Sequence, residues 1–462
     1  MQKIYIDNFG PIEKAEIEIK KMAVLIGEQA SGKSTIGKLI YFFKSLKEDL
    51  FTIVFNSLNT DEDIRLFFLK DIKIKFLNFF GSTKHRQDFK IKYFYSSEKT
   101  IELTLNQRKY LNIAFSENFY GEIGQEVRAL LNAIKKPTNS KNTYELIAIE
   151  QSKTRYLNQL KNIVDRLFED DKPSLYVPAG RNITVTYTEQ FKLDFFGQLT
   201  LESRKTRTRE DRNQSVDIHL MLEFLRKIET IKENFQHNNF DDLIKRELMF
   251  NSITKKYAKV LNNAKNIIFE ILKGKYVHDN FSEKIIFDTK RRRYVHLQNA
   301  SSGQQESIRI LQDLFLILLR KENVFRVIEE PEAHLYPLAQ KKLIELIGMV
   351  VNYTNSEILI TTHSPYILSV INNLIFAKSI DNLKENSISD IYIKNSLIEA
   401  SNFEAYAIKN SDIWEFKSIF DNKSQLIGEN YFDEISEIVE SEFDEMFELY
   451  KELKPKTRRN KL

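Results

Sequence analysis

The stretch GEQASGKS at residues 27–34 decides the fold, because it is a complete GxxxxGK[ST] phosphate-binding loop. The apolar run AVLI at 23–26 precedes it and suits a buried strand, and the following STIGKLIYFFKSL has helical periodicity. Such a loop wraps a polyphosphate with backbone N–H groups at a helix N-terminus, where the helix field favours an anion. The motif therefore predicts that the chain binds a nucleoside triphosphate.

The residues of the loop have separate expected roles. Gly27 and Gly32 are expected to leave room for the phosphates by lacking a Cβ. Lys33 is expected to reach the β- and γ-phosphates, and the Ser34 hydroxyl to bind Mg²⁺. ATP and Mg²⁺ are thus the expected cofactors. The predicted nucleotide-binding residues are Gly27, Gln29, Ser31, Gly32, Lys33, Ser34 and Thr35.

Length and composition predict a multi-lobed, soluble, cytoplasmic protein. The chain has 462 residues, more than the ~250–300 over which one hydrophobic core grows. It contains no cysteine, which excludes disulfides, thiolate zinc sites and a cysteine nucleophile, and fits a reducing compartment. The N-terminus lacks a signal-peptide apolar region, and charged residues interrupt the phenylalanine-rich stretch at 66–80, so no membrane span is expected.

The net charge of +4 is too small to indicate nucleic-acid binding by the whole molecule. Charge is uneven, however, with basic runs at 204–212, 290–293 and 454–461 and an acidic segment at 429–448. Such runs most often form solvated faces or loops.

Hydrophobic periodicity predicts an alternation of strands and helices along the chain. The expected elements are three strands before residue 27, helices over 45–82, an antiparallel meander at 88–117, helices at 122–135 and 144–169, a buried strand at 175–183, helices over 214–273 and a hairpin at 274–297.

A serine- and glycine-containing segment, NASSGQQES at 299–307, precedes a strongly apolar helix. It resembles the signature motif of ABC-type ATPases, whose small residues and helix N-terminus form a second anion site. The matching residues are Ser301, Ser302, Gly303 and Gln304. In ABC-type proteins this site receives the γ-phosphate bound by another subunit. A serine–glycine turn by itself is more often a simple helix cap.

Two further strands end in chemically active residues. VFRVIEEPEAHLYP at 324–337 resembles a Walker B motif, in which Glu329 would hold Mg²⁺ through water and Glu330 would polarise the attacking water. Glutamate in place of the usual aspartate, and Arg326 inside the strand, depart from that motif. ILITTHSPYIL at 358–368 delivers His363, which is expected to hydrogen-bond the γ-phosphate. Glu330 and His363 are the predicted catalytic residues.

Together the four motifs resemble the ABC/SMC-like ATPases of the OLD/AAA_21-type group, in the form that lacks a TOPRIM nuclease domain. The resemblance covers roughly 1–40, 175–185 and 295–380. It adds Arg181, in YVPAGR, and His334 as further site candidates, with Arg181 near the nucleotide or the oligomer interface.

Two loop residues depart from the group's pattern, since Gln29 and Ala30 replace the common Asn-Gly. Tyr5 and Phe9 are candidates for stacking on adenine.

The resemblance implies an α/β fold, a two-lobed ABC-type ATPase head with a P-loop NTPase core, a mixed sheet, and antiparallel and helical insertions. The head would span 1–410, with insertions at about 45–172 and 200–273. Residues 411–462 would form an acidic amphipathic helix and a basic tail. One side of that helix carries Phe432, Ile435, Val439, Phe443, Met446 and Tyr450. This side would pack on the chain's own core or dock a partner.

The resemblance also implies a function, a slow ATPase that forms a dimer or higher homo-oligomer through composite ATP sites. It would control a separately encoded effector, expected to be a nuclease, in antiphage defence, as Septu PtuA-like, PARIS AriA-like and retron-associated ATPases do. No nuclease activity of its own is expected, because His85, His219, His237, His278 and His296 form no metal-spaced set. The alternative is a RecF/Rad50-like DNA-repair ATPase that binds DNA directly through basic clusters. A steep loss of DNA affinity with salt would favour this alternative, and a flat, weak response would exclude it.

Overall fold

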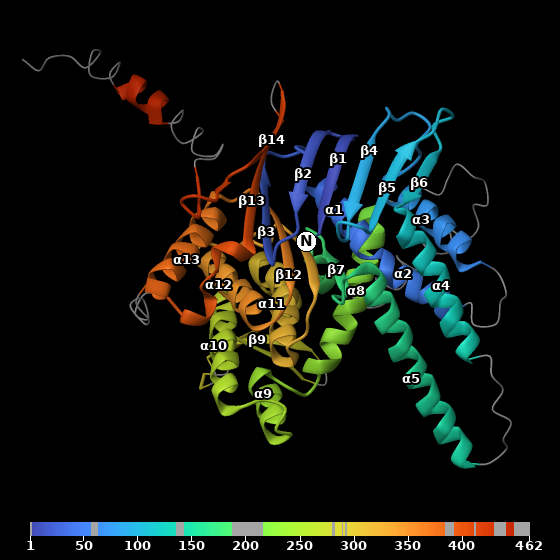
Figure 1. Cartoon of the computed structure of the whole chain (residues 1–462). Helices are drawn as coiled ribbons and strands as arrows, with labels where there is room; N and C mark the ends of the chain where they lie inside the picture. Colours follow the sequence, from blue (N-terminus) through green and yellow to red (C-terminus); the bar gives the residue numbers. More distant parts are fainter. Residues whose placement is uncertain are drawn as a thin grey trace, which may run out of the picture.

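A computed structural model of the chain describes residues 2–56, 63–134, 143–186, 216–279, 282–288, 290–291, 293–383, 392–410, 413–428 and 440–447. At its centre is a six-stranded sheet in the order β14-β13-β3-β12-β11-β7 (Figure 1). Its strands are β3 (Met22–Gly27), β7 (Ser174–Val177), β11 (Phe325–Glu329), β12 (Glu357–Thr362), β13 (Phe403–Asn410) and β14 (Trp414–Ser418).

The five strands from β13 to β7 are parallel, and only the edge strand β14 is antiparallel. Ligands of such sheets bind beyond the carboxyl ends of the strands, where the connecting loops meet. The phosphate loop follows β3, Glu330 follows β11 and His363 follows β12. The topology therefore brings three of the four sequence motifs to one edge of the sheet.

Two hydrophobic cores lie on opposite faces of this sheet. Along β3, Met22, Val24 and Ile26 belong to one core, while Ala23 and Leu25 belong to the other. All six residues of β3 are buried, as expected for a parallel strand covered on both faces. The prediction of two lobes is confirmed in this form.

One face is covered by α1 and by a second, antiparallel sheet in the order β2-β1-β4-β5-β6 (Figure 1). Because β4 pairs with β1, the predicted meander completes the sheet begun by the N-terminal hairpin. The elements of this lobe are β1 (Lys3–Phe9), β2 (Ile12–Glu18), α1 (Lys33–Lys44), α2 (Leu46–Asn56), α3 (Ile64–Phe80), β4 (Lys90–Phe94), β5 (Thr100–Leu105), β6 (Leu111–Phe115), α4 (Glu117–Ile134) and α5 (Thr143–Phe168).

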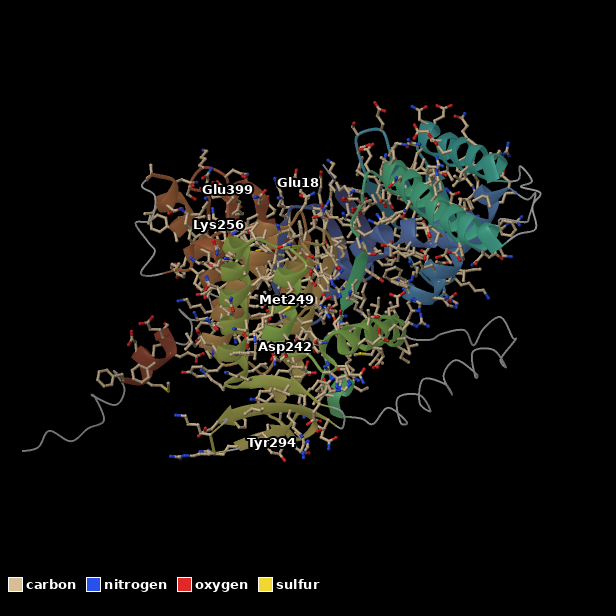
Figure 2. The ribbon with its side chains drawn as sticks, turned by 90° about the horizontal axis from the view of Figure 1, so that it is seen from below. Glu18, Asp242, Met249, Lys256, Tyr294 and Glu399 are labelled. Atoms are coloured by element: carbon tan, nitrogen blue, oxygen red, sulfur yellow. The ribbon has the colours of Figure 1, made fainter. Side chains whose placement is uncertain are left out.

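The other face is covered by helices and by a three-stranded sheet, β10-β9-β8, where the sequence predicted a hairpin. Tyr294 lies on this small sheet, at the end of the molecule away from α4 and α5 (Figure 2). The elements are α6 (Ile183–Thr186), α8 (Val216–Phe235), α9 (Phe240–Met249), α10 (Lys255–Leu272), β8 (Lys275–His278), β9 (Glu283–Asp288), β10 (Arg293–His296), α11 (Ser302–Arg320), α12 (Pro337–Tyr353), α13 (Pro365–Leu383), β15 (Phe420–Asp421) and β16 (Leu426–Ile427). Short 3₁₀ turns occur at Leu297–Asn299, Lys394–Ser396 and Ala400–Asn402.

The predicted α/β fold, with a mixed sheet and with antiparallel and helical insertions, is confirmed by this arrangement. The head sheet also continues past residue 410, because β14 pairs with β13. Within the described ranges no helix is both long and apolar enough to cross a membrane.

Two buried arginines anchor α11, the helix that follows the serine motif. Arg326 lies in the buried strand β11, where the sequence offered no reason for a charged residue. Its guanidinium pairs with the Asp313 carboxylate of α11 at 2.8 Å, which balances the charge inside the core. Arg309 of α11 forms two 2.6 Å hydrogen bonds to the carboxylate of Glu283 in β9. Both pairs fix the orientation of α11 relative to the sheets.

The Glu283–Arg309 pair should make stability depend on acid pH. Burial opposes the charge of Glu283, but Arg309 outweighs it and lowers the pKa of Glu283 from 4.5 to about 2. The carboxylate therefore contributes stability above about pH 4.5, and this contribution is lost as pH falls toward 2. Glu283→Gln should lower the free energy of unfolding at pH 7 by on the order of 3 kcal/mol, and less toward pH 2.

Urea unfolding at pH 7 and pH 3 measures this difference. Glu16→Gln is the matched control, because it breaks an exposed pair with Lys3 and should change stability far less than Glu283→Gln does. An equal effect of the two substitutions at pH 7 would contradict the assignment.

Candidate nucleotide site

The two glycines of the phosphate loop are required by neighbouring protein groups. A Cβ on Gly27 would lie 2.0 Å from the carbonyl oxygen of Ile408 in β13. Gly32 has φ +107°, and a Cβ there would lie 3.1 Å from the Ile12 side chain. The expectation that these glycines make room for phosphates is therefore incomplete, because the sequence did not reveal that β13 and the β1–β2 turn pack against the loop.

Lys33 is buried at the start of α1, and its ammonium group lies among carbonyls and carboxylates. Its Nζ donates to the carbonyl oxygens of Gly27 at 2.8 Å and Glu28 at 2.5 Å. Burial lowers the pKa of Lys33 to about 8, although the carboxylates of Glu330, Glu332, Glu28 and Glu329 each act to raise it. The carboxylates that follow β11 are thus electrostatic neighbours of the loop lysine.

The remaining loop residues differ in accessibility. Ser31 is fully buried, whereas Gln29, Ala30 and Ser34 are exposed and Thr35 is half-buried. Ala30 has φ +60°, a left-handed conformation that costs a residue with a Cβ roughly 1 kcal/mol. This conformation explains why glycine is common at that position.

Glu329, at the end of β11, is buried with both carboxylate oxygens engaged. It accepts hydrogen bonds from the Tyr176 hydroxyl at 2.5 Å and from the Ala179 backbone N–H at 3.1 Å. Each carboxylate oxygen has a second lone pair that can accept from a water of a hydrated metal ion. With the exposed Ser34 hydroxyl, this donor set fits Mg²⁺, which prefers oxygen ligands and retains waters.

No group of three or more histidine or acidic residues among the described residues could hold a metal ion. A magnesium ion at Ser34 and Glu329 would therefore need the oxygens of bound phosphates as well.

The two predicted catalytic side chains meet. Glu330 Oε1 lies 3.0 Å from His363 Nε2, and both side chains are partly exposed, at 40% and 32%. Glu330 has φ +41°, and its backbone N–H donates to the Thr361 carbonyl of β12 at 2.8 Å. A strained backbone held by a neighbouring strand is typical of functional positions. At this distance the carboxylate and the imidazole are in direct hydrogen-bond contact, and the second carboxylate oxygen of Glu330 can accept a hydrogen bond from a water molecule.

Glu332 holds the backbone at His363 in place through hydrogen bonds. Its Oε1 accepts hydrogen bonds from the Thr362 hydroxyl and from the His363 N–H, the latter at 3.2 Å. Burial raises the pKa of the Glu332 carboxyl. Glu332 was not predicted, although it lies two residues after Glu330 in the same motif.

Arg181 braces the carboxylate segment from inside the protein. Its guanidinium is fully buried and donates to the carbonyls of Pro178 at 2.8 Å, Glu329 at 2.6 Å and Glu330 at 2.9 Å. Its backbone N–H donates to the Glu306 carboxylate of α11 at 2.9 Å. Arg181 is therefore near the candidate site, as expected, but it supports Glu330 rather than facing a second subunit.

The serine motif begins α11 at the surface, with Ser301 and Ser302 exposed. Gln304 Oε1 accepts from the backbone N–H and the hydroxyl of Ser301, each at 3.1 Å. A Cβ on Gly303 would lie 2.6 Å from the carbonyl oxygen of His334, whose φ is +60°. The start of α11 and the turn after Glu330 are thus in direct contact, which the sequence alone did not show.

One adenine candidate is wrong. Phe9 is 1% exposed and packs with Phe76, Phe80 and Phe89, so its ring cannot stack on a base. Tyr5 is half-buried in β1, and its hydroxyl donates to Asp7 at 3.3 Å.

The C-terminal predictions are only partly covered by the described residues. Residues 440–447 are helical, and Phe443, Met446 and Phe447 are exposed there. Phe443 and Met446 thus do not pack on the chain's own core, the first of the two alternatives. The other predicted members of that face, and the basic runs at 204–212 and 454–461, lie outside the described residues.

Comparisons with known proteins identify a family for this chain. A family model described as AAA ATPase domain (AAA_15) matches residues 1–368, which include all four motifs. A search of curated proteins finds no match.

Several solved structures of SMC heads resemble the chain. The SMC head bound to the C-winged helix domain of ScpA is 10% identical, with a TM-score of 0.40, and the alignment covers 91% of this chain and 98% of that one. The SMC head domain from Thermotoga maritima is 10% identical, with a TM-score of 0.34 and coverages of 90% and 98%. The Smc head with an extended coiled coil, derived from Pyrococcus furiosus and bound to the C-terminal domain of ScpA, is 14% identical, with a TM-score of 0.37 and coverages of 96% and 99%. These TM-scores are too low to carry a conclusion about this chain.

Proposed function

We propose a function for this chain, which belongs to the AAA ATPase domain family. The protein binds ATP and hydrolyses it slowly, at a site that a second copy of the chain completes. The observation that carries this proposal is the 3.0 Å pair of Glu330 and His363, at the sheet edge that also carries the phosphate loop. An acid–base pair beside a phosphate-binding loop is the arrangement that water attack on a phosphoryl group requires.

Each residue of the site then has a role. Lys33 binds the β- and γ-phosphates, and the loop N–H groups hold the polyphosphate. Mg²⁺, held by Ser34 and through water by Glu329, would neutralise charge between the phosphates. Glu330 orients and polarises the attacking water, while His363 donates to the γ-phosphate. Arg181 and Glu332 keep Glu330 and His363 in place.

The serine motif supplies the second half of the site in another subunit. Ser301 and Ser302 are exposed at the N-terminus of a 19-residue helix, where the N–H groups of the first turn and the helix field favour a phosphate. Gly303 and Gln304 shape this helix start through His334 and Ser301. We therefore expect a dimer or higher homo-oligomer that ATP holds together.

Mixing two inactive variants tests the composite site. Lys33→Ala removes the loop lysine, and Ser301→Arg blocks the serine motif, so each variant alone should hydrolyse almost no ATP. A 1:1 mixture should regain roughly a quarter of the unmutated rate, because half of the dimers are mixed and each then holds one intact site of two. A mixture no more active than its components would refute a site shared between subunits.

The biological role proposed here is control of a separately encoded effector, expected to be a nuclease, in antiphage defence. The sequence resemblance supports this role. The exposed Phe443, Met446 and Phe447 on residues 440–447 offer an apolar face for such a partner. ATP binding would then switch the assembly that presents this face.

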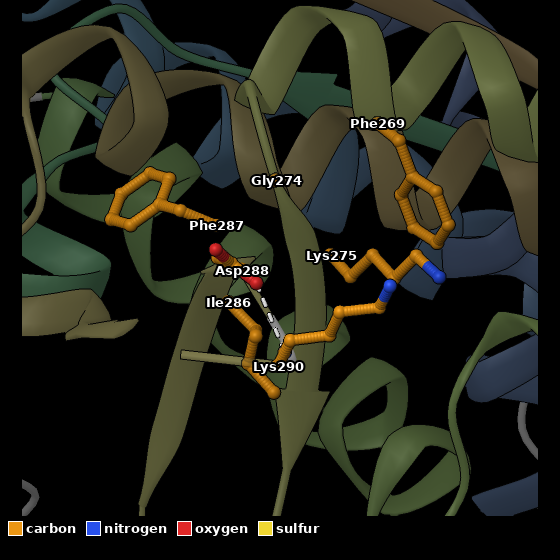
Figure 3. Close-up of a pocket in the computed structure, with 7 residues that line it drawn as sticks. All are labelled: Phe269, Gly274, Lys275, Ile286, Phe287, Asp288 and Lys290. Atoms are coloured by element: carbon orange, nitrogen blue, oxygen red, sulfur yellow. Dashed lines mark hydrogen bonds between the residues drawn. The ribbon is translucent and has the colours of Figure 1, made fainter. Parts of the chain in front are cut away.

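One observation favours direct DNA binding as a second candidate. The β8–β10 sheet exposes Lys290, Arg291 and Arg293 beside Phe287 and Tyr294, a mixture of basic and aromatic side chains typical of nucleic-acid surfaces. A cavity of about 360 Å³ lies on this sheet (Figure 3). Its lining residues are Phe269, Gly274, Lys275, Ile286, Phe287, Asp288 and Lys290. The salt dependence of DNA affinity described above separates the two candidates.

A further inference from the structure

The only tryptophan of the chain, Trp414, touches the phosphate loop from the far end of the sequence. It begins β14, and its indole N–H donates to the carbonyl oxygen of Ser31 at 3.0 Å. Ser31 is fully buried and Trp414 is nearly so. The hydrogen bond is therefore shielded from water. Losing the donor would be costly, because no water could replace it at the buried carbonyl.

A ladder of aromatic rings fixes the orientation of the indole. Trp414 is stacked with Phe416, with ring centroids 6.1 Å apart and planes 7° from parallel. Phe416 is stacked in turn with Tyr406 of β13, at 5.1 Å and 20°. The Tyr406 hydroxyl accepts from the backbone N–H of Glu18 at 3.0 Å, which ties the ladder to β2.

The same strand pair also touches the other end of the loop. Ile408 of β13 is in register with Gly27, and its carbonyl oxygen occupies the space where a Cβ would lie. A loop that points its N–H groups at phosphates must turn carbonyls away from them, and buried carbonyls need donors. Trp414 supplies such a donor from outside the loop, and Ile408 limits the movement of the first glycine.

We propose that the β13–β14 strand pair clamps the phosphate loop in its binding conformation, with Trp414 as the positioning residue. The inference rests on the proposed function only in taking ATP as the ligand of the loop. By linkage, a nucleotide that stabilises the clamped loop must stabilise the strand pair to the same extent. Nucleotide occupancy is thereby coupled to the segment that leads into the C-terminal residues.

Trp414→Phe tests the clamp, because it keeps an aromatic ring and removes the N–H. If the loop then adopts its binding conformation for only about a tenth of the time, the Kd for ATP rises about tenfold. Phe416→Tyr is the matched control, since it changes an aromatic residue of the same strand but keeps both the ring that stacks on Trp414 and the indole donor. It should change the Kd for ATP by less than about twofold, because the fraction of molecules with the loop in its binding conformation stays nearly the same. Equal Kd values for all three proteins, or equal losses in both variants, would overturn the proposal.

Amide hydrogen exchange over residues 27–34 in nucleotide-free protein tests the clamp without relying on ATP. Exchange should be faster in Trp414→Phe than in Phe416→Tyr and the unmutated chain, and unchanged exchange in Trp414→Phe would overturn the proposal. If the unmutated chain bound no ATP, the proposed function would fail while this comparison still decided the inference.

A second variant covers the case in which Trp414→Phe does not fold. Trp414 is replaced by its benzothiophene analogue, in which sulfur takes the place of the N–H. Exchange as slow as in the unmutated protein would contradict a role for the N–H, and faster exchange would support it.

Discussion

Glu330→Gln should lower the ATP turnover rate by about 10²–10⁴-fold, the usual effect of removing a general base. The side chain keeps its shape, so ATP binding should survive and the ATP-held oligomer should accumulate. Single-turnover hydrolysis and sedimentation with and without ATP measure the two effects. The expectation follows from the 3.0 Å contact of Glu330 with His363 and from the exposure of both side chains to an incoming water.

Glu28→Gln is the matched control for this substitution. Its carboxylate also acts on the pKa of Lys33, but Glu28 lies in the loop rather than at the end of β11. We expect it to hydrolyse ATP at close to the unmutated rate. Wild-type turnover by Glu330→Gln would show that another group activates the water.

Arg181→Met should lower the free energy of unfolding by about 3–5 kcal/mol, the cost of breaking a buried ion pair by removing one partner. The substitution leaves the buried Glu306 carboxylate without its guanidinium, 3.5 Å away. It also removes the donors to the Glu329 and Glu330 carbonyls. Activity should fall with stability, because the strained backbone of Glu330 loses its support.

Chemical unfolding of Arg181→Met and Arg181→Lys measures this brace. Lysine keeps the charge but cannot reproduce the fork of donors, so it should recover part of the stability and little of the activity. A loss below about 1 kcal/mol in the methionine variant, the value typical of an exposed pair, would contradict the buried role of Arg181.

Local pattern and strand order explain what the sequence could predict. The apolar runs before residues 27, 330 and 363 predicted three strands. Neighbouring parallel strands end at the same edge of a sheet, which places Glu330 beside His363. The strand-rich block at 88–117 was likewise visible as alternation, which is a local property of the chain.

Contacts between distant segments could not be predicted in the same way. Nothing in the loop indicates that Ile408 and Trp414, nearly four hundred residues later, pack against Gly27 and Ser31. Arg326 looked out of place because its partner, Asp313, is on another element. Phe9 looked available for stacking because its aromatic neighbours come from α3 and the segment before β4.

The close approach of backbone to Gly27 and Gly303 limits how this protein should be disabled in a cell. An alanine at either glycine would collide with a carbonyl oxygen, 2.0 Å and 2.6 Å away, and would disturb the fold as well as any bound nucleotide. A null phenotype from such an allele would not separate a lost activity from a lost protein. Alleles at Lys33 and Ser301 make the cleaner genetic tools, because neither change forces two backbone segments apart.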